Sequence, residues 1–400
     1  MQKAEYPIGI VLAKIPGYSE TFLHNKINGL IEKGYSAKVF VNIREKTGYP
    51  KKWKVYHQPK AGRFAVITIP AMLITILAAF LRKPNHVMRF CALEKKDGIS
   101  LKKRLISLYL NTHILVHRLE WLHFGFSTMA VGKENVAKAM GARMAVSLRG
   151  YDISIYPLKH AGCYNRLWQK VDKVHTLSRA LIQLAWNHGL PMNTRWKRIP
   201  PAIRADKFQP NGRAFSFPGS PVKILTVSRL HWIKGLDYAL QALKILKDQH
   251  YPFHYTIIGT GEEWERLHYT RHQLNLENEV EFTGKISHMD IPGYMHSHNI
   301  YLQPSLQEGF CNSVLEAQAA GMLCIVTDAE GLTENVIEDQ TGWIVPRRNP
   351  RAIAEKIVKI TEASGERLAG IRSAATKRVA AEFQVETQIE KFVEFYEPKS

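Results

Sequence analysis

The sequence has few cysteines, and none is spaced as a metal ligand or as a partner in a disulfide framework. Its 400 residues include four: Cys91, Cys163, Cys311 and Cys324. The start of the chain also lacks the basic, then apolar, then small-residue succession of a secretion signal. We therefore expect a protein of the reducing cytoplasm.

Acidic residues are scarce in the first half. Residues 1–215 hold 36 Lys and Arg against 11 Asp and Glu, whereas residues 216–400 hold 19 against 24. A basic half can face nucleic acid, an anionic membrane surface or an anionic substrate. The basic motifs interleaved with aromatics that a nucleic-acid binder needs are missing, so we expect no nucleic-acid partner.

One long apolar run, Phe64 to Leu81, has no charged residue and is flanked by cations on both sides. About 20 residues span a bilayer, but Pro70 splits this run and leaves a helix-competent piece of only about 16 Å. A short transmembrane helix, a buried helix and a helix on a membrane surface all stay open. The flanking cations favour the membrane surface.

Short apolar runs alternate with amphipathic segments in both halves, which predicts an α/β fold. Residues 8–43 read as strand, helix and strand, and the pattern restarts at residue 222 after a stretch rich in Pro, Gly and Ser. We expect two doubly wound, Rossmann-like domains that face a central cleft. Their expected bounds are 1–208 and 222–400, with a linker at 209–221 and a final helix able to pack back on the first domain.

Cationic residues and glycines follow two predicted strands of the second domain. Arg229 and Lys234 come between a strand and a helix, where a planar fork and a point charge can together neutralise a diphosphate. Gly259 and Gly261 end the next strand and are small enough for a base or ribose to lie against the backbone.

The stretch from Ser305 to Gly321 contains two glutamates on either side of a predicted helix start. Glu308 lies in a loop, and Glu316 lies in a helix for which Asn312 is the expected N-cap. The free backbone amides of such a helix terminus attract anions, so a phosphate-bearing ligand is expected here.

Four motifs of the second half resemble, in their order, the donor-binding half of the retaining family 4 glycosyltransferases, which have the GT-B fold. The motifs are Ser-Arg-x4-Lys-Gly, Gly-x-Gly, Pro-Ser-x2-Glu-Gly-Phe-x2-Ser-x2-Glu-Ala-x3-Gly and "EGLTENVIEDQTGWIVP". The resemblance covers about residues 221 to 395. It implies that Glu308 contacts the donor sugar, that Glu316 accepts hydrogen bonds from ribose hydroxyls, and that Arg229 and Lys234 hold the diphosphate. The implied donor-binding set is Glu316, Gly309, Phe310, Cys311, Asn312, Ser313, Gly259 and Gly261, with the amides of residues 310–312 assisting at the diphosphate. Cys311 stands where the family has a small residue or proline, and we interpret it as a packing residue.

The first half is similar to bacterial exopolysaccharide transferases of the colanic-acid type, through "GYSETFLHNKINGLIEKGY" and "LHFGFSTMAVGKENVAKAMGARMAVSLRGYDIS". Many members carry His in a Phe-His-Gly-Tyr-Asp element, where this chain has Arg149. Either Arg149 supplies a hydrogen-bond donor to the transferred sugar or to the acceptor, or His123 reaches the site. Ser19, Glu20 and Asp152 are the implied acceptor-side residues.

A metal site is the competing interpretation of His113, His117 and Glu120, whose spacing could share one helical face. Strand-like flanks and the lack of a His-Glu-x2-His motif favour a structural role. The family resemblance likewise implies transfer without a metal or other cofactor.

The resemblance implies a retaining glycosyltransferase that moves a hexose from a nucleotide-diphosphate sugar to a growing, lipid-linked saccharide in cell-surface polysaccharide biosynthesis. We expect it on the inner face of the plasma membrane, with an anionic membrane surface as a partner. A nucleotide-sugar epimerase on the same fold is the alternative. A nicotinamide dehydrogenase is disfavoured because neither first strand-to-helix turn has Gly-x-Gly-x-x-Gly.

Overall fold

The computed structural model describes residues 7–16, 21–43, 48–60, 65–210, 212, 217 and 221–397, which form two compact units. The first unit comprises residues 1–199 together with 389–400, and the second comprises residues 200–388. Parts of the expected linker, and Ser19 and Glu20, lie outside the described residues.

The first unit is built on a seven-stranded parallel sheet of order β3-β2-β1-β4-β5-β6-β7. Its central strands are apolar and buried on both faces because helices cover them. The strands are β1 (Pro7–Leu12), β2 (Ser36–Val41), β3 (Lys54–His57), β4 (Trp121–Phe124), β5 (Arg143–Leu148), β6 (Lys173–Thr176) and β7 (Arg195–Arg198).

Helices of this unit connect successive strands, and α2, α3 and α4 together fill the long β3–β4 connection. They are α1 (Thr21–Glu32), α2 (Ala65–Arg82), α3 (Pro84–Lys96), α4 (Leu101–Leu115), η2 (Ser127–Ala130), α5 (Val136–Met140), α6 (Tyr151–Ser154), α7 (Tyr156–Lys159), α8 (Asn165–Trp168) and α9 (Arg179–Asn187). The chain's last helix, α17 (Val385–Tyr396), packs Phe392, Phe395 and Tyr396 into the core of the first unit.

The second unit has a six-stranded parallel sheet of order β10-β9-β8-β11-β12-β13. The strands are β8 (Val222–Val227), β9 (Phe253–Ile258), β10 (Val280–Gly284), β11 (Ile300–Gln303), β12 (Leu323–Thr327) and β13 (Trp343–Val345). The helical segments are η3 (Ala205–Phe208), η4 (Trp232–Lys234), α10 (Leu236–Asp248), α11 (Trp264–Gln273), α12 (Ile291–Ser297), α13 (Asn312–Ala319), α14 (Leu332–Asn335), α15 (Pro350–Thr361) and α16 (Gly365–Glu382).

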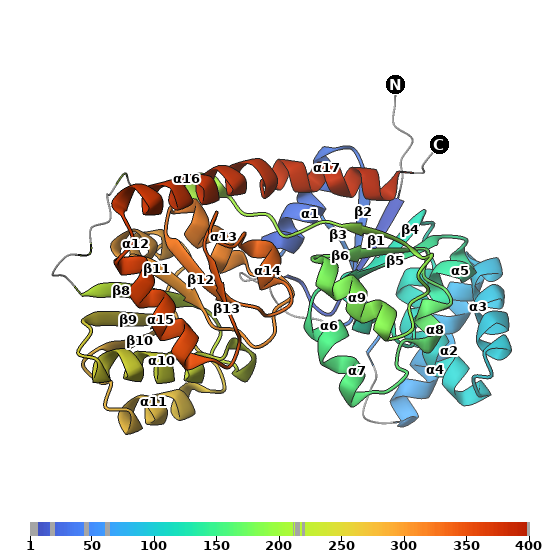
Figure 1. Cartoon of the computed structure of the whole chain (residues 1–400). Helices are drawn as coiled ribbons and strands as arrows, with labels where there is room; N and C mark the ends of the chain where they lie inside the picture. Colours follow the sequence, from blue (N-terminus) through green and yellow to red (C-terminus); the bar gives the residue numbers. More distant parts are fainter. Residues whose placement is uncertain are drawn as a thin grey trace. The chain divides into compact units, whose positions relative to one another are not determined.

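Helices cover both faces of this second sheet, with α10 and α15 packed together on one face and α12 and α13 on the other (Figure 1). The apolar sides of α10 and α15 pack with the strands into one buried core. The predicted pair of doubly wound α/β domains is therefore confirmed.

Candidate active site

The strand order of the second unit marks the place where a ligand is expected. The chain runs outward from β8 to β9 and β10, and then returns to place β11 on the other side of β8. Loops leaving two such neighbouring strands diverge, which opens a crevice at their carboxyl ends. Arg229 and Lys234 follow β8 and Glu308 follows β11, so all three belong to this switch point.

Lys234 and Glu308 form an ion pair between these two loops. Their side chains are only 11% and 14% exposed, and the hydroxyl of Ser305 also donates to Glu308 at 3.4 Å. Burial, the largest single influence, would lower the pKa of Lys234, but the charge of Glu308, its hydrogen bond and the nearby Cys311 together raise that pKa. Lys234 is therefore a fixed cation at neutral pH, whereas Arg229 is exposed.

Gly235 explains how Lys234 comes so close to the loop that bears Glu308. Its φ is +60°, and an added Cβ would lie 2.2 Å from the carbonyl oxygen of Pro304. The amide of Leu306 donates to the carbonyl of Ile233 at 2.7 Å, which joins the two loops. The Lys-Gly pair in the sequence is thus a cation followed by the one residue that this packing allows.

The loop after Glu308 differs from the prediction in one detail. Helix α13 begins at Asn312, and Cys311 rather than Asn312 is its N-cap, without a side-chain capping bond. Asn335 of α14 holds the backbone of Cys311 through two hydrogen bonds. Its Oδ1 accepts from the Cys311 amide and its Nδ2 donates to the Cys311 carbonyl, both at 2.9 Å. The Cys311 amide is therefore already bonded within the protein.

The side chains of Phe310 and Cys311 point into the protein. Both are buried, and burial raises the pKa of the Cys311 thiol to about 11, so it stays protonated and unreactive at neutral pH. Ser313 accepts a hydrogen bond from Tyr301 at 2.7 Å. Gly309 lies under Gly331, where a Cβ would come within 2.0 Å of the Gly309 carbonyl oxygen.

Glu316 has a partner that the motif did not reveal. His288, in the connection between β10 and α12, places its Nε2 3.1 Å from Glu316 Oε1. This hydrogen bond is the main reason that the pKa of His288 is raised. The side chain of Glu316 is 12% exposed, so one carboxylate oxygen is held by His288 at the edge of the site.

Gly259 and Gly261 lie where two backbone segments of this unit are in close contact. A Cβ on Gly259, whose φ is +144°, would lie 1.8 Å from the carbonyl oxygen of Ser228, and one on Gly261 would lie 2.1 Å from that of Leu230. The segment that carries Arg229 therefore lies against both glycines, and their predicted contact with a base or ribose stays a prediction. These glycines therefore position Arg229 by letting two loops touch.

In the first unit, Arg149 follows β5 at the carboxyl edge of the sheet. Its Nε donates to the carbonyl of Gly125 at 2.9 Å, and its guanidinium lies 4.1 Å from the ring centroid of Phe22. Asp152 is buried and accepts from the amides of Arg149 and Gly150, each at 2.9 Å. Asp152 thus holds the turn that presents Arg149.

His123 lies inside the core. It is fully buried in β4, with Tyr396 Oη 2.6 Å and Lys26 Nζ 3.2 Å from its Nδ1, and with Ser147 Oγ 2.8 Å from its Nε2. Burial and the nearby cation lower its pKa, so the ring is neutral. Of the two candidates for the missing family histidine, the structure places Arg149 at the sheet edge and His123 in a buried network.

The proposed metal ligands lie in different surroundings. Helix α4 ends at Leu115, so His117 and Glu120 are beyond it; the ring of His117 packs on Tyr56 at 4.2 Å, and Glu120 pairs with Arg143. Among the residues that the structure describes, no group of three His, Cys, Asp or Glu side chains is placed to hold a metal ion.

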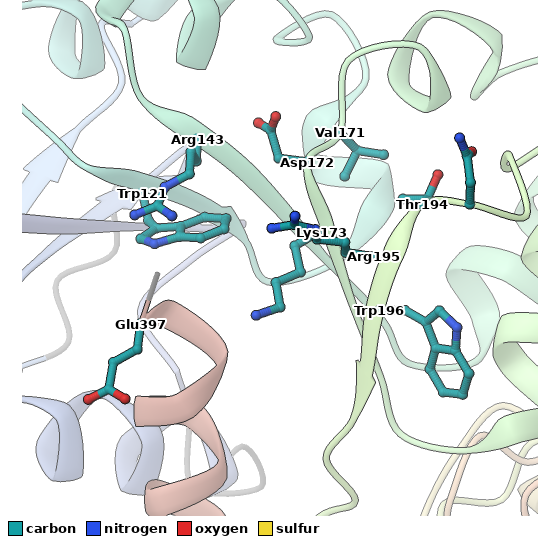
Figure 2. A pocket seen from close by; sticks show the side chains of 10 residues that line it. Trp121, Arg143, Val171, Asp172, Lys173, Thr194, Arg195, Trp196 and Glu397 are labelled. Carbon is teal, nitrogen blue, oxygen red and sulfur yellow. The ribbon is translucent and has the colours of Figure 1, made fainter. Parts of the chain in front are cut away.

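A hollow of about 840 Å³ lies in the first unit and is lined by none of the predicted site residues (Figure 2). It lies at the amino ends of β4 to β7, the edge opposite to that used by ligands of doubly wound sheets. Trp121 and Lys173 donate to the carbonyls of Tyr396 and Phe395, at 2.9 and 2.6 Å. These side chains hold the end of α17. The lining residues are Trp121, Arg143, Val171, Asp172, Lys173, Asn193, Thr194, Arg195, Trp196 and Glu397.

A family model now identifies the unit that carries the switch-point residues. The model for glycosyl transferases group 1 matches residues 209–378. This segment is a group 1 glycosyl transferase domain. Arg229, Lys234, Glu308 and Glu316 all lie inside it.

Similarity also extends over nearly the whole chain. The colanic acid biosynthesis glycosyltransferase WcaL of Escherichia coli K12 is 25% identical over 392 residues, which cover 94% of this chain and 96% of that protein. The amylovoran biosynthesis glycosyltransferase AmsK of Erwinia amylovora is 25% identical over 96% of this chain and 97% of its own.

Among solved structures, sucrose-phosphate synthase of Thermosynechococcus elongatus (TM-score 0.72) and Anabaena HepE in complex with UDP and glucose (TM-score 0.71) are both 17% identical. Each covers 98% of this chain, and the chain covers 98% and 99% of them. The predicted GT-B fold and the predicted resemblance are confirmed. The group 1 domain and its exopolysaccharide relatives support glycosyl transfer over the epimerase alternative.

Proposed function

We propose that this glycosyl transferase domain binds a nucleotide-diphosphate sugar at the β8–β11 switch point and that the chain transfers the sugar to a lipid-linked saccharide with retention of configuration. The observation that carries the proposal is the buried ion pair of Lys234 with Glu308 at the carboxyl ends of β8 and β11, with Arg229 near Lys234 and Glu316 in the helix that follows the Glu308 loop. HepE, which shares the fold, has been solved in complex with UDP and with UDP-glucose.

The cations act on the leaving group. When the bond between the anomeric carbon and the diphosphate breaks, negative charge grows on the phosphate oxygens. Lys234, which keeps its proton at neutral pH, and Arg229 are positioned to stabilise that charge, and stabilisation that grows toward the transition state raises the rate. Two cationic side chains can stabilise the leaving diphosphate without a metal ion, so we propose metal-independent transfer.

The carboxylates distinguish sugar from nucleotide. Glu308 lies at the ion pair, where the sugar attached to the diphosphate would reach it, and Glu316, oriented by His288, would accept from ribose hydroxyls. The departing diphosphate can take the proton of the attacking hydroxyl on the same face, so no covalent nucleophile is required. Arg149 in the first unit is the proposed contact to sugar or acceptor.

A donor screen followed by transfer tests the proposal. UDP, GDP, ADP and their common sugar conjugates are screened by thermal shift, since a ligand of the folded state raises the midpoint. The stabilising conjugate, labelled in the sugar, is then incubated with an extract of lipid-linked saccharides, with and without EDTA. We expect label in the lipid fraction and an axial or equatorial linkage that matches the donor, in both conditions. Activity lost in EDTA and restored by one divalent ion would contradict metal independence, and donor isomerised without acceptor would indicate an epimerase.

The same chemistry suggests where the protein works. A lipid-linked acceptor is confined to a membrane, and we propose the inner face of the plasma membrane as the location. None of the helices in the described part of the chain is long and apolar enough to cross a bilayer. The association would therefore be through a surface of the protein.

A further inference from the structure

Helix α2 of the first unit exposes an unusual set of side chains. Positions 69, 73, 77 and 81, with 74 beside them, recur at helical spacing and form one stripe. Among the described side chains of α2, only Ala79 is fully buried. The exposed fractions are 52% for Ile69, 57% for Leu73, 68% for Ile74, 58% for Leu77 and 73% for Leu81.

The neighbouring helices extend this character. Helices α2, α3 and α4 pack against one another in pairs and lie side by side in the first unit (Figure 1). Met88 on α3 and Leu101, Leu105 and Ile106 on α4 are also exposed. An apolar helix that leaves its apolar stripe uncovered is characteristic of a surface that meets a membrane or a partner.

The charges on these helices indicate which of the two. Residues 65–115 contain eight Lys and Arg, and their only carboxylates are Glu94 and Asp97. Both carboxylates are used within the unit: Arg166 donates to each, at 3.2 and 3.0 Å, and Asn135 and Lys170 also bond them. Six of the cations are exposed and two, Lys83 and Arg104, are half-buried. The exposed six are Arg82, Arg89, Lys95, Lys96, Lys102 and Lys103.

We infer that α2, with the cations of α3 and α4 around it, is the surface through which the first unit docks on an anionic membrane. Helix α2 lies in the plane of the interface, with its stripe at the boundary between headgroups and acyl chains, and the Lys and Arg side chains contact lipid phosphates. A protein partner would require matching carboxylates and an apolar face, whereas a membrane of anionic lipids supplies both over any area. The inference builds on the proposed location and specifies the surface, but it does not depend on the transfer reaction.

Vesicle sedimentation tests the docking surface. The full chain is mixed with vesicles of equal parts phosphatidylglycerol and phosphatidylcholine, or of phosphatidylcholine alone, at low and physiological salt. We expect binding to the anionic vesicles that weakens with salt, since the Debye length is about 8 Å at physiological ionic strength. Lys102→Glu with Lys103→Glu should weaken it about 30-fold or more, because each cation near an anionic surface contributes about fivefold.

The apolar contribution needs its own variant. Leu73→Ser, Ile74→Ser and Leu77→Ser together should weaken vesicle binding at least about tenfold at every salt concentration. Matched controls are Leu158→Ser with Met192→Ser, which are exposed apolar positions elsewhere in the unit, and Lys359→Glu with Lys377→Glu in the second unit. Both controls should bind vesicles as the parent does.

Three outcomes would overturn the inference: no vesicle binding by the parent, equal binding by all variants, or a parent dimer that the α2 variant converts to a monomer without a change in vesicle binding. The last would identify a second copy of the chain as the occupant. UDP binding, measured on each variant by calorimetry, should stay at the parent value. That readout separates a failed docking surface from a failed assignment of the donor site.

Discussion

Glu308→Gln should separate the stability of the donor site from its chemistry. The substitution keeps the shape of the side chain and removes the charge that faces Lys234. Removing one partner of a buried ion pair costs about 3–5 kcal/mol, and we expect the lower end because the two side chains keep 11% and 14% exposure. In a unit of the size of residues 200–388, about 3 kcal/mol lowers the melting midpoint by roughly 6–12 °C.

The double variant Lys234→Met with Glu308→Gln is the control for this loss. It removes both charges, so most of the stability should return, since an ion pair replaced as a whole is often neutral. Its function should not return, because the diphosphate then lacks its buried cation. Glu308→Gln alone should keep UDP affinity within a few-fold of the parent or better, and should reduce sugar transfer by about 100-fold or more.

Calorimetric unfolding, UDP titration and initial rates of transfer measure the three quantities on the same samples. An unchanged midpoint in Glu308→Gln would contradict the ion pair. Transfer at the parent rate would show that this carboxylate does not act on the sugar, and stability that fails to return in the double variant would show that its cost is not electrostatic.

Five further substitutions test other parts of the structure. Gly259→Ala should destabilise the second unit by about 3 kcal/mol or more in denaturant unfolding, since its Cβ would meet a backbone carbonyl, whereas Gly284→Ala, with φ +73° and open space, should cost about 1 kcal/mol. His123→Gln should lower the melting midpoint and leave the rate per folded molecule unchanged, whereas Arg149→Lys should slow transfer more than about tenfold with little change in the midpoint. The pKa of His288 is raised by its carboxylate partner, so its contribution to stability is fully present below about pH 6.5 and fades as pH rises through the higher pKa of the folded state. His288→Gln should therefore lower the melting midpoint at pH 6 but not at pH 9. The loss in free energy of unfolding at pH 6 should be no more than about 1 kcal/mol, because the pair is partly exposed. Equal effects at both pH values would contradict this assignment.

The parts of the fold that depend on local pattern could be predicted from the sequence. Apolar runs bounded by turns predicted β1 and β2 of the first sheet and the restart of the pattern at β8, and the position of Arg229, Lys234 and Glu308 just after strands placed them at one sheet edge. The run of residues 64–81 was harder, because helix α2 is apolar whether it is buried or exposed. Only its packing against α3 and α4 shows which side chains stay outside.

Contacts between distant residues could not be predicted in this way. Asn335 is 24 positions from Cys311 and His288 is 28 positions from Glu316, and neither spacing belongs to a helix or strand period. The Gly-x-Gly spacing likewise indicates a close approach to the backbone, but it does not say what approaches. In this chain the loop of Ser228 to Leu230 lies against both glycines.

The pairing of Lys234 with Glu308 also constrains how a donor must bind. In the structure each satisfies the other, so a diphosphate that reaches Lys234 brings its negative charge next to a carboxylate that is only 14% exposed. Two anions beside one cation repel each other. The repulsion is relieved if the Glu308 side chain breaks its ion pair with Lys234 and turns to accept hydrogen bonds from the sugar. A nucleoside diphosphate without a sugar offers no such replacement, whereas the complete nucleotide sugar does. We therefore expect Glu308→Gln to raise the affinity for UDP and to lower the ratio of nucleotide-sugar affinity to UDP affinity. Calorimetry measures both affinities, and parallel changes in the two would refute this exchange.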